Sequence, residues 1–138
     1  MRKSSGDRSR WPLALVGLVT VIVIPAAGGA VVALDAFTTP ERGQWELRDR
    51  GSGQTRRVCL RDGRDLIQLR HRGLSCRQTA VERGNTSAVV QYNCGSRGYG
   101  RTSIRVENPR LVQVESSGIA GGAPFEVSIE ARYMGQCR

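Results

Sequence analysis

The chain contains few of the residues from which catalytic and metal sites are usually built. Its 138 residues include one histidine and one lysine, and aromatic side chains make up 5% of the sequence. The histidine, His71, lies between two arginines, whereas acid–base catalysis needs a positioned partner that these neighbours do not supply. We therefore interpret His71 as a solvated surface residue. The sequence also has no G-x-S-x-G motif and no P-loop lysine, so we expect no catalytic residue and no cofactor.

Charged residues are missing from residues 11–34, an apolar stretch that follows the basic residues 1–10. As a helix this stretch would extend about 36 Å at about 1.5 Å per residue, longer than the hydrocarbon core of a bilayer at about 30 Å. We predict a transmembrane anchor with residues 1–10 in the cytoplasm, because the basic flank stays inside. Pro25 and the small residues after it leave open a cleavable signal peptide.

Both interpretations export the rest of the chain. The anchor predicts an inner-membrane protein whose C-terminal domain lies in the periplasm, and cleavage predicts a protein secreted to the periplasm. We divide the exported part into a short linker, residues 35–42, and one disulfide-bonded β domain, residues 43–138.

The four cysteines are Cys59, Cys76, Cys94 and Cys137. No two have the close C-x2-C spacing of structural zinc sites, so we expect no metal site. An even number in a small exported domain is typical of two disulfides. We favour Cys59–Cys76, which closes a short loop, and Cys94–Cys137, because alternation along the strands would place both on the inner face. The alternative is Cys76–Cys94, which would lie almost opposite each other if the chain turns at Gly84-Asn85.

The exported part alternates apolar and polar residues, as half-buried strands do. The clearest strand is 125–133, with Phe125, Val127, Ile129, Ala131 and Tyr133 on one face. The other expected strands are 44–48, 57–61, 88–94, 102–106 and 111–115. One short helix is expected within 63–70, capped by Asp62 or Asp65. The fold class is mainly β, a single antiparallel sheet of about six or seven strands curled into a half-barrel or sandwich, with one short helix.

The formal net charge is +9, and almost all of the basic residues are arginine. Arginine offers a planar fork of donors that suits carboxylate and phosphate, although GC-rich coding explains its abundance more simply. The candidate anion contacts are Arg56, Arg57, Arg70, His71 and Arg72. We expect no nucleic-acid partner, because single-strand readers also use aromatic platforms and an exported domain does not meet nucleic acid. Anionic envelope components such as lipid or lipopolysaccharide head groups are the accessible partners.

Several short motifs follow one another over about residues 41–138. They are Gly43-Gln44-Trp45-Glu46, Cys59-Leu60, Cys76, Tyr92-Asn93-Cys94-Gly95 and Arg132-Tyr133-Met134-Gly135-Gln136-Cys137. In this combination the chain resembles the exported proteobacterial family catalogued as domain of unknown function 3617. Leu66-Ile67-Gln68-Leu69 and Gly98-Tyr99-Gly100-Arg101-Thr102 are similar to its sphingomonad-type members. The resemblance brings no catalytic residues. We expect a non-catalytic periplasmic binding or structural module; the alternative is a small periplasmic enzyme whose site is not visible in the sequence.

Overall fold

A computed structural model describes residues 35–138 of the chain. The predictions for residues 1–10 and 11–34 lie outside the described residues. Within residues 35–138 no helix is both long enough and apolar enough to cross a membrane.

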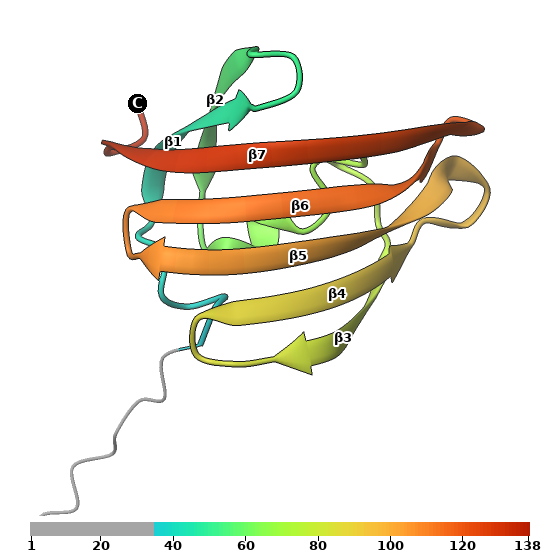
Figure 1. The fold of residues 1–138 in the computed structure, drawn as a ribbon, viewed down its shortest axis with the longest axis horizontal. Helices are drawn as coiled ribbons and strands as arrows, with labels where there is room; N and C mark the ends of the chain where they lie inside the picture. Colours follow the sequence, from blue (N-terminus) through green and yellow to red (C-terminus); the bar gives the residue numbers. More distant parts are fainter. Residues whose placement is uncertain (1–34) are drawn as a thin grey trace, which may run out of the picture. The chain divides into compact units, whose positions relative to one another are not determined.

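Seven strands form one antiparallel sheet (Figure 1). They are β1 (Gly43–Asp49), β2 (Thr55–Leu60), β3 (Arg77–Arg83), β4 (Ser87–Asn93), β5 (Gly98–Asn108), β6 (Leu111–Ala120) and β7 (Ala123–Gly135). Their order across the sheet is β2-β1-β7-β6-β5-β4-β3. After the β1–β2 hairpin, the chain therefore crosses to the far edge and returns strand by strand until β7 pairs with β1. The predicted fold class, mainly β with a single antiparallel sheet, is confirmed.

Alternation along the strands explains which side chains form the core. In β5, Thr102, Ile104 and Val106 are buried, while Arg101 and Arg105, at alternate positions, are exposed. The same period of two continues across β6 and β7, so one face of the sheet is apolar and the other is polar. Each fully buried Val, Leu or Ile side chain contributes about 1.5–3 kcal/mol, which commits the sheet to this register.

Strand β3 was not predicted, because every one of its residues is exposed. A strand without a buried face has no apolar–polar alternation for a sequence pattern to detect. It lies at the edge of the sheet and is held by pairing with β4, from Arg77 opposite Asn93 to Arg83 opposite Ala88.

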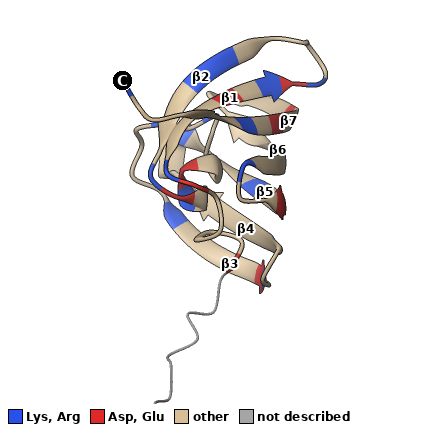
Figure 2. Ribbon diagram, turned by 90° about the vertical axis from the view of Figure 1, so that its left-hand side faces the viewer, with Lys and Arg blue, Asp and Glu red and all other residues tan. Residues whose placement is uncertain are grey.

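The chain between β2 and β3, residues 61–76, crosses the apolar face of the sheet and is called the crossing segment below. Figure 2 looks along the strands and shows the sheet curled around it. Leu66, Ile67 and Leu69 of this segment are buried in the core. Its only helix is one 3-10 turn, Gly63–Leu66, which Asp62 caps by accepting a hydrogen bond from the Arg64 N–H. The helix predicted within 63–70 is thus a single turn. A segment this short has little helical stability of its own, so it extends only as far as packing supports it.

Residues 35–42, predicted to be a linker, belong to the folded domain. Ala36 and Phe37 are buried in the core. The Phe37 carbonyl accepts a hydrogen bond from the Gly63 N–H at 2.7 Å, and the Ala36 N–H donates to the Gly84 carbonyl. The guanidinium groups of Arg64 and Arg83 lie 5.5 and 5.4 Å from the centre of the Phe37 ring. The apolar pair Ala36-Phe37 explains the difference, because burying it fastens this segment to the sheet.

The predicted disulfide pairing is wrong. The disulfides are Cys59–Cys137 and Cys76–Cys94, so the alternative that the sequence left open for Cys76 is the correct one. Cys76 and Cys94 directly flank Arg77 and Asn93, which are opposite each other in the β3–β4 hairpin. Alternation did not predict the partner of Cys94, because β4 ends at Asn93 and the strand pattern does not continue to Cys94. Disulfides persist in oxidising compartments, so the pairing indicates an extracytoplasmic location such as the periplasm.

Cys59 reaches the C-terminus through the strand order. It lies opposite Gln44 of β1, and Gln44 in turn lies opposite Gly135 at the end of β7. Cys137 follows two residues later and bonds back across β1 to β2. The β7–β1 pairing that brings these cysteines together joins distant parts of the sequence, which explains why local spacing did not predict it.

Candidate anion-binding site

Three of the five predicted anion contacts come together beside strand β2. Arg56 lies on β2, on the same side as the buried Val58, and Arg70 and Arg72 lie on the crossing segment. Arg56 and Arg70 line one small cavity of about 140 Å³, together with Asp49 and apolar side chains that include Leu69. Arg56, Arg70 and Arg72 are called the arginine cluster below.

The arginine cluster concentrates positive charge. Burial and the neighbouring charges of Arg72 and Arg70 lower the pKa of Arg56, while Asp49 acts in the opposite direction. Nine other arginines among residues 35–138 lie within 4.0 Å of a carboxylate, but none of the three cluster members does. A bound anion would stabilise this arrangement, since guanidinium groups form their strongest hydrogen bonds with carboxylate and phosphate.

Arg70 is oriented by an aromatic ring. Its guanidinium carbon lies 5.8 Å from the centre of the Phe125 ring, a cation–π geometry. Phe125 belongs to β7, so the sheet positions a side chain that the crossing segment supplies. The cluster is thus assembled from β2 and the crossing segment and supported by a third element.

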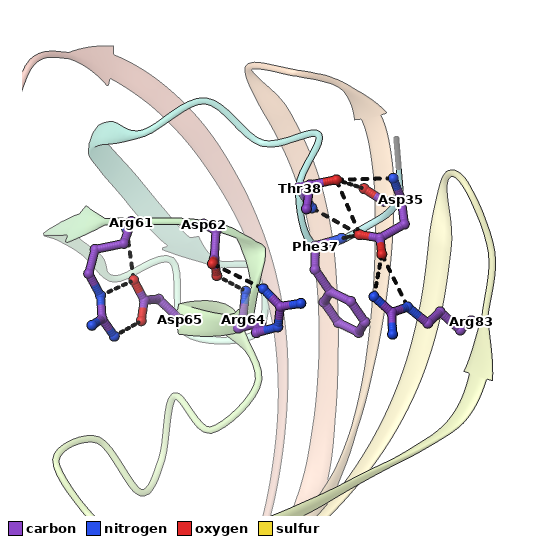
Figure 3. A network of polar contacts seen from close by, with 8 residues as sticks. All are labelled: Asp35, Phe37, Thr38, Arg61, Asp62, Arg64, Asp65 and Arg83. Carbon is purple, nitrogen blue, oxygen red and sulfur yellow. Dashed lines mark hydrogen bonds and ion pairs between the residues drawn. The ribbon is translucent and has the colours of Figure 1, made fainter. Parts of the chain in front are cut away.

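A wider depression of about 810 Å³ is lined by Arg72 together with Arg61, Arg64 and Gln68 among others. Two of its arginines are already engaged, as Figure 3 shows. Arg61 donates to both oxygens of Asp65, and Arg64 pairs with Asp62 at 3.2 Å. These pairs neutralise Arg61 and Arg64. Of the three arginines that line the depression, Arg72 therefore keeps an unpaired positive charge among residues 35–138.

The structure separates the two other predicted residues from the cluster. Arg57 points to the opposite face of β2, where it lies 4.0 Å from Glu46. His71 is only 4% exposed, so its interpretation as a solvated surface residue is wrong. Along the crossing segment Leu69 and His71 turn inward while Arg70 and Arg72 turn outward. This local alternation is a signal in the sequence that would have placed His71 inside.

Two polar contacts hold the ring of His71. Its Nε2 lies 3.2 Å from the Arg97 carbonyl, and its Nδ1 lies 3.2 Å from the Tyr92 hydroxyl. A carbonyl only accepts, so Nε2 carries the hydrogen, and in the neutral ring Nδ1 accepts from Tyr92. Burial raises the pKa of Tyr92. Neither partner of His71 is a carboxylate.

A second group of polar contacts anchors the crossing segment. Ser116 lies 2.8 Å from Thr102, and Thr102 donates to the Ile67 carbonyl of the crossing segment. His71 and Ile67 both lie on the crossing segment, whereas Tyr92, Thr102 and Ser116 lie on the sheet. The two groups of contacts therefore fasten the crossing segment at two points and so hold Arg70 and Arg72 at the cluster.

No protein-family model, curated protein or solved structure matches this chain. Its class is therefore defined by its own fold and site. It is an extracytoplasmic β domain with two disulfides, whose curled sheet encloses a crossing segment that presents unpaired arginines.

Proposed function

We propose that this protein is a non-catalytic binding module of the cell envelope that holds an anionic group at the arginine cluster. The observation that carries the proposal is the gathering of Arg56, Arg70 and Arg72, none of which has a carboxylate of residues 35–138 within ion-pair distance. Asp49 lines the same cavity beyond ion-pair distance and offsets only part of this charge, so holding the three arginines together costs stability. A ligand that supplies the missing negative charge accounts for the arrangement.

The size of the cavity limits the ligand. Ligand pockets for drug-sized molecules enclose about 300–1,000 Å³, whereas the cavity between Arg56 and Arg70 encloses about 140 Å³. It suits a single phosphate or carboxylate head, with the rest of the ligand outside. The guanidinium groups of Arg56 and Arg70 come from separate elements. This arrangement favours phosphate, because its oxygens accept hydrogen bonds from several directions at once.

The proposed location supports this partner. The disulfides indicate an oxidising compartment, and the apolar residues 11–34 support an inner-membrane anchor with the domain in the periplasm. An anchored domain faces phospholipid head groups directly, and cleavage of residues 11–34 as a signal would still leave it among envelope anions. The resemblance to domain of unknown function 3617 supports export and remains a prediction. A periplasmic enzyme has less support, since His71 hydrogen-bonds to a phenol and a carbonyl and lies beside no acid.

The test is the thermal unfolding of the full chain in an uncharged detergent, with and without inorganic phosphate, at constant ionic strength. We expect phosphate to raise the Tm of the natural protein, because a ligand that binds only the folded state stabilises it. The triple variant Arg56→Gln/Arg70→Gln/Arg72→Gln should lose this increase. A matched control, Arg57→Gln/Arg105→Gln/Arg132→Gln, removes the same charge from arginines that pair with carboxylates and should keep it. An equal response of the two triple variants would contradict the proposal.

A further inference from the structure

The outer face of the sheet carries a slot on the side away from the core. Its cavity volume is about 470 Å³, within the range of ligand pockets. Two rows of outward-pointing residues form its walls. One wall is Arg77, Asn93 and Tyr99, which lie opposite one another on β3, β4 and β5. The other wall is Thr79, Gln91, Arg101 and Ser117, which lie opposite one another on β3, β4, β5 and β6.

The floor of the slot is backbone. Tyr92, Gly100 and Gly118 lie between the two walls, and their alternation directs Cβ toward the core. A Cβ on Gly100 would lie 2.5 Å from the Tyr92 hydroxyl, and one on Gly118 would lie 2.1 Å from the Tyr99 carbonyl. Glycine at both positions lets the Tyr92 hydroxyl and the Tyr99 carbonyl approach the backbone closely, so the floor of the slot is tightly packed. The walls stand about 7 Å apart, two residues along a strand.

The walls carry an excess of hydrogen-bond donors. Among residues 35–138, Arg77 lies within 4.0 Å of no carboxylate, and the contact of Arg101 is a loose one, 3.9 Å from an exposed Glu82. Asn93 accepts from the Gly95 N–H through its Oδ1, which leaves its amide nitrogen free to donate. A ligand that fits this lining presents negative charge and several acceptor oxygens.

Tyr99 adds an apolar surface to the polar walls. Tyr99 is 54% exposed, so its ring is accessible on the outer face. A pyranose ring presents C–H groups on its faces and hydroxyl groups around its edge, and an aromatic ring beside amides and hydroxyls complements both. The lining therefore combines one stacking surface, neutral donors for hydroxyl groups and two guanidinium groups for an acid.

We propose that this slot binds an anionic saccharide, with Tyr99 against a sugar face and Arg77 and Arg101 on its carboxylate or phosphate groups. The site is independent of the arginine cluster, since none of its lining residues belongs to that cluster. A sugar carboxylate and a sugar phosphate share the chemistry that the guanidinium groups recognise, and the probes below distinguish them.

The experiment is an NMR titration of the full chain in an uncharged detergent with digalacturonic acid, glucose 6-phosphate, maltose and inorganic phosphate. We expect saturable shifts of the backbone amides of residues 77–79, 91–93, 99–101 and 117–118 with at least one acidic sugar. Whichever acidic sugar binds more tightly identifies the acid group. Maltose lacks the acid and should bind more weakly.

Variants test the assigned contacts. Arg101→Gln should weaken binding at least about tenfold, because hydrogen bonds to charged groups are worth that much in affinity. Arg105→Gln is the matched control on the same outer face of β5, and it should bind like the natural protein. Tyr99→Ser should weaken binding, whereas Tyr99→Phe, which keeps the ring, should retain it. The triple variant of the arginine cluster should also retain saccharide binding, which separates this proposal from the preceding one.

The slot proposal is overturned by any of three results. These are equal affinities of Arg101→Gln and Arg105→Gln, no saturable shift at the slot with either acidic sugar, and identical shifts with inorganic phosphate alone, which would mean anion binding without a sugar.

Discussion

The Nδ1 atom of His71 lies 3.2 Å from the hydroxyl of Tyr92, in the buried space between the crossing segment and strand β4. This contact joins the only histidine of the chain to the sheet. The other ring nitrogen of His71, Nε2, lies within hydrogen-bond distance of the Arg97 carbonyl. A residue type often associated with catalysis here holds the crossing segment in place. The arginine cluster depends on this contact, since residues 70 and 72 flank His71.

Replacing Tyr92 with phenylalanine should destabilise the domain by about 1–3 kcal/mol, because His71 Nδ1 then lacks its buried partner. The free energy of unfolding in urea measures the effect. Tyr99→Phe is the matched control, since Tyr99 is half exposed and its change should alter the free energy by less than about 0.5 kcal/mol. Equal losses from the two changes would argue against a buried polar anchor.

Acid should weaken the attachment of residues 35–42. Burial alone would raise the pKa of Asp35, but hydrogen bonds from Arg83 and from the Phe37 and Thr38 N–H groups outweigh it and hold the pKa below its ordinary value of 3.8. Figure 3 shows these contacts. Because its pKa is lowered, the ionised Asp35 carboxylate stabilises the fold above about pH 4. This contribution is lost as the pH falls further and the carboxylate is protonated.

The variant Asp35→Asn should therefore be less stable than the natural protein at neutral pH, and the difference should shrink below about pH 4. Urea unfolding at a series of pH values from neutral to acidic measures it. Glu107→Gln, which removes an exposed carboxylate paired with Arg105 on the outer face, is the control and should show a smaller difference. A constant difference at every pH would rule out the Asp35 contribution.

The two disulfides should contribute unequally to stability. Cys59–Cys137 has a sequence separation of 78 residues and Cys76–Cys94 one of 18. On the chain-entropy estimate, closing these loops stabilises the fold by about 4.5 and about 3 kcal/mol respectively. Paired cysteine-to-serine variants, compared by urea unfolding, should therefore lose more when Cys59–Cys137 is removed. Peptide mapping without reduction checks the pairing itself, and a Cys59–Cys76 peptide would contradict the structure.

The arginine cluster should be a source of strain in the absence of an anion. Removing Arg72 relieves repulsion on Arg56, whose lowered pKa reports that its charged form is disfavoured. Arg72→Gln should thus raise the free energy of unfolding at low ionic strength by up to about 0.5 kcal/mol, a small value because these side chains are exposed. Added salt should abolish the gain by screening. Arg105→Gln, which breaks an ion pair with Glu107, should show no gain at any salt concentration.

Sequence alternation was sufficient to predict the sheet wherever one face of a strand is buried. The predicted strand 125–133 lies within β7, and its residues Ile129 and Ala131 are in the core. Alternation failed for β3, which buries nothing, and for residues 35–42, where two apolar residues were too few to form a pattern. Local patterns report burial, and these two segments are held mainly by hydrogen bonds and a single aromatic side chain.

The sites depend on contacts between distant parts of the sequence. Arg56, Arg70 and Arg72 were named as basic residues, but the crossing of the chain between β2 and β3 is what places them together. Cys59 and Cys137 meet only because β7 pairs with β1. The outer slot likewise requires the order of β3, β4, β5 and β6, which no short motif encodes.

Anion binding at the arginine cluster is tested most directly by NMR of the arginine side-chain Nε–H resonances of the full chain during titration with inorganic phosphate. An anion site at the arginine cluster should give saturable shifts for Arg56, Arg70 and Arg72 with one common dissociation constant, and much smaller shifts for the paired Arg57 and Arg105. Uniform, unsaturated shifts of all the arginines would contradict it, because they would show general screening of a basic protein in place of a binding site.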